Sequence, residues 1–211
     1  MIFPRTTALE AASSIRESLT PLVGKIADSG DLRMEKSTLS RIEFVVEQCD
    51  RDQLVDVMSH AGWRKLRTGR GPLVFACAGF PKAVICTAHK ERADLLGVNR
   101  PSNFEVLLFL RTGTQIFLRG ILDHIRDTGF SLKPEQGLCR GDKLIAWTEE
   151  PIFRACGLSF IPPNERYHFR PEKYRTRPPS PADSFSVSVG RDLQLRTPGS
   201  APENLALEVV F

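Results

Sequence analysis

Long apolar runs, paired cysteines and a large net charge are all missing from this sequence. No stretch approaches the roughly 20 consecutive apolar residues that a helix needs to cross a bilayer, so the sequence predicts no membrane span. Residues 1–5 do not lead into the apolar core and small-residue cleavage site that mark a secretory signal. We therefore expect an intracellular protein, in the cytoplasm or inside an organelle, rather than a secreted one.

Cysteine pairs with the spacing of a zinc site are also missing. The five cysteines are scattered and odd in number, which favours ordinary thiols in a reducing compartment; they are Cys49, Cys77, Cys86, Cys139 and Cys156. The four histidines share no metal-ligand spacing with the cysteines or with one another. These residues therefore predict no metal and no cofactor. The net charge of +4 is modest and does not by itself indicate a nucleic-acid partner.

The composition is that of a soluble globular protein. A chain of 211 residues, 41% hydrophobic and 26% charged, is one ordinary domain, with or without an appendage, and can bury a core. Apolar spacing predicts helices over 7–26, 51–62, 115–128 and 149–156, and strands over 42–46, 73–78, 83–88 and 144–147. The short connection between the strands at 73–78 and 83–88 favours an antiparallel hairpin. Together these elements predict an α+β fold.

The composition changes after residue 163. Eight of the fifteen prolines lie between residues 162 and 202, and so much proline does not build a packed interior. We therefore divide the chain into a domain over 1–165 and a basic, proline-rich C-terminal arm over 166–211. Two pieces of the arm, 185–189 and 205–211, alternate like strands, and exposed apolar strands favour docking on a neighbouring chain or back on the same domain.

The most specific motif lies in residues 148–166. It reads Thr-Glu-Glu-Pro-Ile-Phe, then Gly-Leu, then Pro-Pro-Asn-Glu-Arg. In this order it resembles the closing segment of the family X DNA polymerases, which are polymerase-β-like nucleotidyltransferases. Four upstream pieces follow the same family order, at 29–33, 111–114, 129–132 and 136–138. The resemblance covers roughly residues 8–166.

This resemblance implies a fold and a set of nucleotide contacts. The fold would be a nucleotidyltransferase palm, a mixed or antiparallel sheet with helices on one face, followed by a small thumb-like C-terminal subdomain. In the triphosphate turn, the family's serine is Asp31 here and its second basic residue is Met34. The nucleotide-binding positions that remain are Gly30, Arg33, Thr112 and Gly113.

The catalytic acids of that family are mostly absent. Nucleotidyl transfer uses two divalent cations, held in the family by three carboxylates, two of them at i and i+2 on one strand. Here the first pair is Arg41 and Glu43, and Val84 takes the third place. A guanidinium repels cations, and one carboxylate of three cannot assemble the site. The resemblance therefore implies a pseudoenzyme without catalytic residues.

The first part of the arm mixes basic and aromatic residues. The candidate contacts are Arg166, Tyr167, Arg170, Lys173, Tyr174, Arg175 and Arg177. Cations bind phosphates and rings stack on bases, so the mixture suits single-stranded nucleic acid. It equally suits an acidic groove on a protein partner, or a linker kept soluble by its charge.

Three functions remain open at this point. We favour a catalytically inactive component of a larger assembly that binds other protein subunits through the arm, with DNA or RNA as a further candidate partner. The first alternative is an active minimal family X polymerase or terminal transferase, with Mg²⁺ or Mn²⁺ held by Glu43 and acids such as Asp31, Glu35 or Glu47. The second is a non-catalytic module that binds nucleotide or single-stranded nucleic acid through Arg33, Arg41, Thr112 and the arm.

Overall fold

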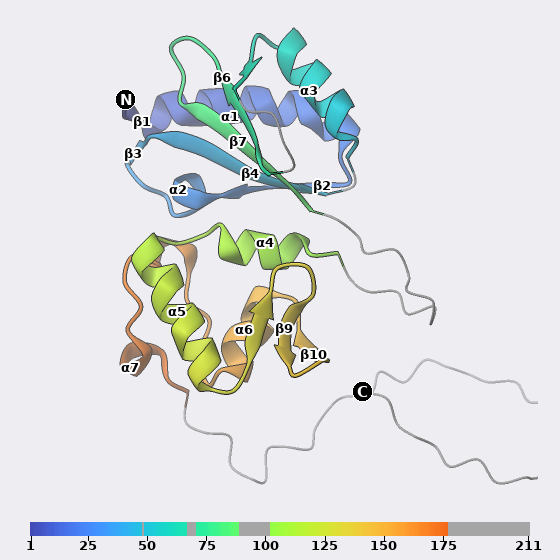
Figure 1. Cartoon of the computed structure of the whole chain (residues 1–211). Coiled ribbons are helices and arrows are strands. Elements are labelled where there is room, and N and C mark those ends of the chain that lie inside the picture. The colour runs from blue at the N-terminus through green and yellow to red at the C-terminus, as the bar shows by residue number, and fades with distance from the viewer. Residues whose placement is uncertain (48, 67–70, 89–101, 177–211) are drawn as a thin grey trace, which may run out of the picture. The chain divides into compact units, whose positions relative to one another are not determined.

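The computed structural model of the chain describes residues 1–47, 49–66, 71–88 and 102–176. Over these ranges the protein is α+β, with a five-stranded mixed sheet, two smaller antiparallel sheets and seven α-helices (Figure 1). The predicted fold class is therefore confirmed at this level. In the described part of the chain, no helix is both long and apolar enough to cross a membrane.

The five-stranded sheet has the order β2-β4-β7-β6-β5. Its strands are β2 (Lys25–Ser29), β4 (Arg41–Glu47), β7 (Lys82–Ala88), β6 (Leu73–Ala76) and β5 (Arg64–Lys65). The central strands β4 and β7 are parallel, and every other neighbouring pair is antiparallel. The antiparallel β6–β7 hairpin confirms the one predicted from the short connection. Two further short strands, β1 (Phe3–Pro4) and β3 (Thr38–Leu39), pair with each other.

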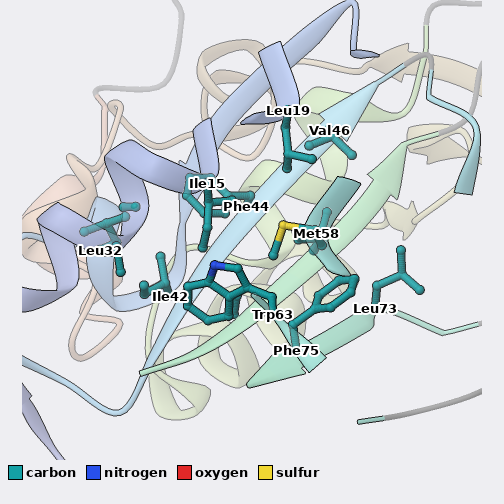
Figure 2. Close-up of a cluster of buried hydrophobic side chains, with 14 of the residues drawn as sticks. Ile15, Leu19, Leu32, Ile42, Phe44, Val46, Met58, Trp63, Leu73 and Phe75 are labelled. Carbon is teal, nitrogen blue, oxygen red and sulfur yellow. The ribbon is translucent and has the colours of Figure 1, made fainter. Parts of the chain in front are cut away.

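One face of this sheet packs against helices α1 (Arg5–Leu19) and α3 (Arg51–His60) (Figure 1). Strand side chains alternate between faces, so Ile42, Phe44 and Val46 of β4 all enter this core. They meet Ile15 and Leu19 of α1, and Met58, Trp63 and Phe75 belong to the same cluster (Figure 2). The odd-numbered residues of β4 therefore lie on the opposite face.

Helix α1 ends earlier than its apolar spacing predicts. The predicted helix over 7–26 is wrong at its end, because α1 stops at Leu19 and a 3-10 turn follows over Thr20–Leu22. Pro21 has no amide proton to continue the helical hydrogen bonds. Residues 25–29 instead form β2, which pairs over its whole length with the part of β4 from Glu47 to Glu43.

Two glycines end helices where the sequence predicts an end. Gly62 has φ +84°, and the amide of Trp63 donates to the carbonyl of Met58 at 2.9 Å, so the last turn of α3 is closed. Gly129 has φ +81° after α5 (Gln115–Asp127), and the amide of Phe130 donates to the carbonyl of Ile125. Only a residue that tolerates positive φ cheaply makes such a turn.

A second core lies in residues 102–176. It is built from α4 (Phe104–Leu110), α5, a three-stranded antiparallel sheet of β8 (Ser131–Lys133), β9 (Gly137–Arg140) and β10 (Lys143–Ala146), α6 (Glu149–Ala155) and α7 (Pro171–Tyr174). Phe109, Phe117, Ile121 and Phe153 are fully or almost fully buried in it. The predicted helix at 149–156 is confirmed as α6, and the pieces at 129–132 and 136–138 fall in the antiparallel pair of β8 and β9.

Helix α4 covers part of the second face of the five-stranded sheet. Phe104 and Leu108 of α4 share a buried cluster with Val45, Cys86 and Ala88, which lie toward the C-terminal ends of β4 and β7. At the N-terminal ends of the same two strands, Arg41 and Lys82 are exposed and lie opposite each other in the register.

The arm expected to begin at residue 166 starts inside the folded unit. Arg166 is wholly buried and Tyr174 is 9% exposed. The amide of Thr114 donates to the carbonyl of Arg166 at 3.0 Å, and the amide of Ser159 donates to the carbonyl of Tyr174 at 2.8 Å. Residues 166–176 are therefore packed, which corrects the boundary at 165/166. A proline-rich composition does not indicate whether a charged side chain or an aromatic ring in the segment is buried. Residues 177–211, with Arg177 and the strand-like pieces at 185–189 and 205–211, lie outside the described ranges.

Candidate functional site on the second face of the sheet

Arg41, Glu43 and Val84 lie together on the sheet face opposite α1 and α3. Glu43 is the register partner of Val84 in the parallel pair β4–β7 and of Ser29 in the antiparallel pair β2–β4. The carboxylate of Glu43 is almost fully buried, with a side chain 3% exposed, and it forms an ion pair with Nε of Arg41. The charge of Glu43 is therefore neutralised by its own neighbour two residues away.

This arrangement places a guanidinium where the resemblance would place a metal-binding carboxylate. Magnesium prefers hard oxygen ligands, and here the three positions supply one carboxylate, one cation and one isopropyl group. Within residues 1–47, 49–66, 71–88 and 102–176, no three His, Cys, Asp or Glu side chains lie close enough to hold one ion.

The other acids considered as metal ligands have surroundings of their own. Asp31 forms an ion pair with Lys36 at 2.5 Å, and Glu47 forms one with Lys25 at 3.8 Å. Glu47 lies four residues along β4 from Glu43, which is about 13 Å of strand. Glu35 sits in a turn with φ +58°. Glu43 and Glu47 are therefore too far apart to share an ion.

The space beside Gly30 is filled by the side chain of Glu43 and is not open for a phosphate. Gly30 has φ +57°, and its amide donates to the carbonyl of Arg111 at 2.7 Å. A Cβ at this position would lie 2.9 Å from both Cδ and Oε1 of Glu43. Glycine is required here for backbone conformation and for the close approach of Glu43.

Arg33 points to an internal carboxylate. Its Nη1 and Nη2 donate to Oε1 and Oε2 of Glu149, each at 2.7 Å, and Nη1 also donates to Oγ1 of Thr112 at 3.0 Å. Thr112 in turn donates to the carbonyl of Leu108 at 2.7 Å. The structure thus brings Arg33 and Thr112 together, but an acid of the chain accepts hydrogen bonds from both Nη atoms of Arg33.

Glu149 also accepts hydrogen bonds from Arg166. The Nη1 and Nη2 of Arg166 lie 2.9 and 3.3 Å from Oε1 and Oε2 of Glu149, and its Nε donates to the carbonyl of Ile161 at 2.9 Å. Four phenylalanine rings surround this guanidinium with centroids 5.3–6.0 Å away, which favours a desolvated cation; they are Phe109, Phe117, Phe153 and Phe160.

The ionisation of this cluster follows from its burial and its pairing. Burial alone would raise the pKa of Glu149, but hydrogen bonds from Arg33 and Arg166 outweigh it and hold the pKa below its ordinary value. Burial lowers the pKa of Arg166, and Glu149 opposes that change. A carboxylate shared by two guanidinium groups therefore stays ionised and joins residues from three separate segments.

Gly113 has a packing role beside this cluster. Its φ is +139°, and a Cβ there would lie 2.6 Å from Cδ1 of Phe117 and 3.5 Å from Cβ of Arg166. The cluster itself was missed at the level of sequence, although Glu149 and Arg166 both belong to the motif at 148–166. The same motif also contains the charged residues Glu150, Arg154 and Glu165, so residue type alone did not distinguish the buried pair.

The basic and aromatic residues of 167–176 have mixed surroundings. Tyr167 is 40% exposed, and the Lys36 ammonium lies 5.8 Å from its ring centroid. Lys173 and the hydroxyl of Tyr174 both bond to Oε2 of Glu165, at 2.6 and 2.5 Å. Arg170 and Arg175 are exposed. Within the described residues, Tyr167, Arg170, Lys173 and Arg175 are thus the exposed members of the predicted contact set, and Lys173 is already paired with Glu165.

A pocket of about 560 Å³ opens beside Arg41. Its floor is formed by Val74 and Ala76 of β6 and by Val84 of β7, which share one face of the hairpin. Arg41 and Lys82 line it as well. The pocket therefore lies next to the three positions that would carry catalytic acids.

Comparison of the sequence with models of known protein families gives no match, and no curated protein is similar enough to count as a relative.

Proposed function

We propose that this chain is a catalytically inactive, nucleotidyltransferase-like protein that serves as an interaction component of a larger assembly. The observation that carries the proposal is the ion pair between Arg41 and Glu43, with Val84 beside Glu43 in the register. A two-metal mechanism needs carboxylates at these places, and the chain instead neutralises the one that it has.

The architecture supports the nucleotidyltransferase part of the proposal. A mixed sheet with α1 and α3 on one face fits the palm that the resemblance implies, and the smaller second core fits a thumb-like subdomain. Fold alone does not give function, so the weight rests on the residues at the site.

The residues at the nucleotide-binding positions of the resemblance make contacts within the chain, and this supports the proposal that the protein is catalytically inactive. Arg33 pairs with Glu149, Gly30 makes room for Glu43, and Gly113 makes room for Phe117. These contacts explain why the residues are present without a polyphosphate. They also predict that the same residues stabilise the fold, which stability measurements can test.

The deciding experiment is incorporation of labelled nucleotides onto primed and single-stranded DNA, with Mg²⁺ and with Mn²⁺. The full chain should show no transfer above that of a Glu43→Gln variant under either metal. Transfer by the full chain that disappears in Glu43→Gln would overturn the proposal and establish the active alternative, a minimal polymerase or terminal transferase.

A second candidate function is non-catalytic binding of single-stranded nucleic acid. It is favoured by the exposure of Arg170, Arg175 and Tyr167, because cations contact phosphates and rings stack on bases. Binding of single-stranded DNA should weaken steeply with salt and disappear in Arg170→Glu/Arg175→Glu. Retention that is insensitive to salt, or unchanged in that variant, would rule this candidate out.

A further inference from the structure

We infer that the pocket beside Arg41 receives an acidic and apolar peptide segment of a partner protein. The inference rests on the proposed function and names the partner chemistry of that same sheet face. The pocket has a volume of about 560 Å³, which lies within the range of about 300–1,000 Å³ for pockets that hold organic ligands.

The pocket exists because α4 covers only part of the second sheet face. Val45, Cys86 and Ala88 lie in the cluster with α4, and Val74 and Val84 belong both to that cluster and to the pocket lining. The N-terminal half of the face is bordered instead by Phe3 of β1 and by Phe80 of the β6–β7 turn. The ring of Phe80 lies 6.2 Å from that of Trp63, which fixes one wall to the main core. Apart from Ser40, Arg41 and Lys82, the lining is thus apolar.

The charge of the pocket selects its occupant. Arg41 and Lys82 are neighbours in the β4–β7 register and both line the pocket, and no acidic side chain is among its described lining residues. Arg41 uses Nε for Glu43, and its side chain remains 58% exposed. Within the described ranges, Lys82 forms no ion pair with an acid. A ligand with an apolar side chain next to a carboxylate would pack against the apolar walls and pair with the two cations.

The same observations favour a peptide over a nucleic acid. A nucleic-acid strand is held by a track of cations along several phosphates, whereas this pocket offers two adjacent cations above an apolar floor. One or two carboxylates beside an aliphatic or aromatic residue match that arrangement, and apolar burial supplies most of the free energy of binding.

The test selects a display library of random 12-residue peptides on the full chain. We expect enrichment of sequences with Asp or Glu next to Phe, Leu, Ile or Met. The synthetic peptides should lose at least about tenfold in affinity for Lys82→Glu, because the variant replaces attraction by repulsion. Ala76→Leu, which fills the floor without changing charge, should weaken binding as well. Arg119→Glu, the same change of charge on the exposed face of α5, should bind like the unmodified chain.

Three results would overturn the inference. The first is that acidic and apolar peptides are not enriched, and the second is that the peptides bind Lys82→Glu as tightly as the unmodified chain. The third is that Lys82→Glu loses binding of oligo(dT) but not of the peptides, which would make the occupant a nucleic acid. Far-UV circular dichroism shows whether each variant is folded, and the two pocket variants test the site independently. Nucleotide transfer by the full chain would refute the proposed function, whereas absence of both transfer and peptide binding would refute only this inference.

Discussion

Arg33 and Glu149 lie 116 residues apart in the sequence and are joined by two parallel hydrogen bonds of 2.7 Å. Arg33 belongs to the short helix α2 (Gly30–Arg33), next to the five-stranded sheet, and Glu149 begins α6 in the second core. Such a bidentate pair fixes orientation as well as distance. The position that the resemblance assigns to phosphate binding thus serves to connect the two cores.

Glu149→Gln should destabilise the protein by about 3–5 kcal/mol, because it leaves two guanidinium groups, one of them wholly buried, without their carboxylate. Urea unfolding monitored by circular dichroism measures the change. The neighbouring Glu150→Gln is the matched control, since Glu150 is 63% exposed in its pair with Arg154. It should cost less than about 1 kcal/mol, and equal effects of the two variants would contradict the structure.

Arg166→Lys should fail to replace Arg166. A lysine ammonium cannot make two parallel bonds to a carboxylate and bond to the carbonyl of Ile161 at the same time. We expect a loss of about 2–4 kcal/mol in the free energy of unfolding. In a double-mutant cycle with Glu149→Gln, the two losses should add to clearly more than the loss in the double variant. Additive losses would mean that the two side chains do not interact.

Stability should fall in acid through Glu149. Its pKa is lowered in the folded state, so the carboxylate contributes stability above the pKa of the unfolded chain, near the ordinary value of 4.5. That contribution is lost as the pH falls below that value and through the lower folded pKa. Thermal midpoints measured between pH 7 and pH 3 should therefore drop more steeply for the unmodified chain than for Glu149→Gln. Parallel curves would show that Glu149 is not the group responsible.

Gly30→Ala should be more damaging than Gly79→Ala. Both glycines have positive φ, +57° and +81°, so each substitution carries a backbone cost of about 1–2 kcal/mol. A Cβ at residue 79 would meet nothing within 4 Å, whereas at residue 30 it would strike the Glu43 carboxylate. The two variants should therefore differ in the free energy of unfolding that each loses, and this difference measures the contact with Glu43. Equal losses would mean that the Glu43 carboxylate does not lie against Gly30.

A metal site should be created by Arg41→Asp/Val84→Asp. The register puts these two positions beside Glu43, so the variant would present three carboxylates on one sheet face, as divalent cations require. Electron paramagnetic resonance of added Mn²⁺ should detect binding to this variant and not to Arg41→Asn/Val84→Asn. Equal Mn²⁺ binding by the unmodified chain would contradict the proposal that Arg41 neutralises Glu43.

Local patterns predicted much of the fold. Helices α3, α5 and α6 appear where the apolar spacing places them, because their periodicity and the glycines at 62, 129 and 157 act within a few residues. The exception is the end of α1. There the pairing of β2 with β4, a contact between distant segments, decides the structure of residues 25–29.

The sequence by itself determined the α+β class, the β6–β7 hairpin, and the absence of an acid at residues 41 and 84, since residue identity and local periodicity are enough for these. Only the tertiary structure decided that Arg33 and Arg166 share Glu149, and that Arg166 lies in the interior rather than in an arm. The physical reason is that burial and ion pairing depend on which distant segments meet. A charged side chain looks the same in a sequence whether its partner is water, a phosphate or a carboxylate 116 residues away.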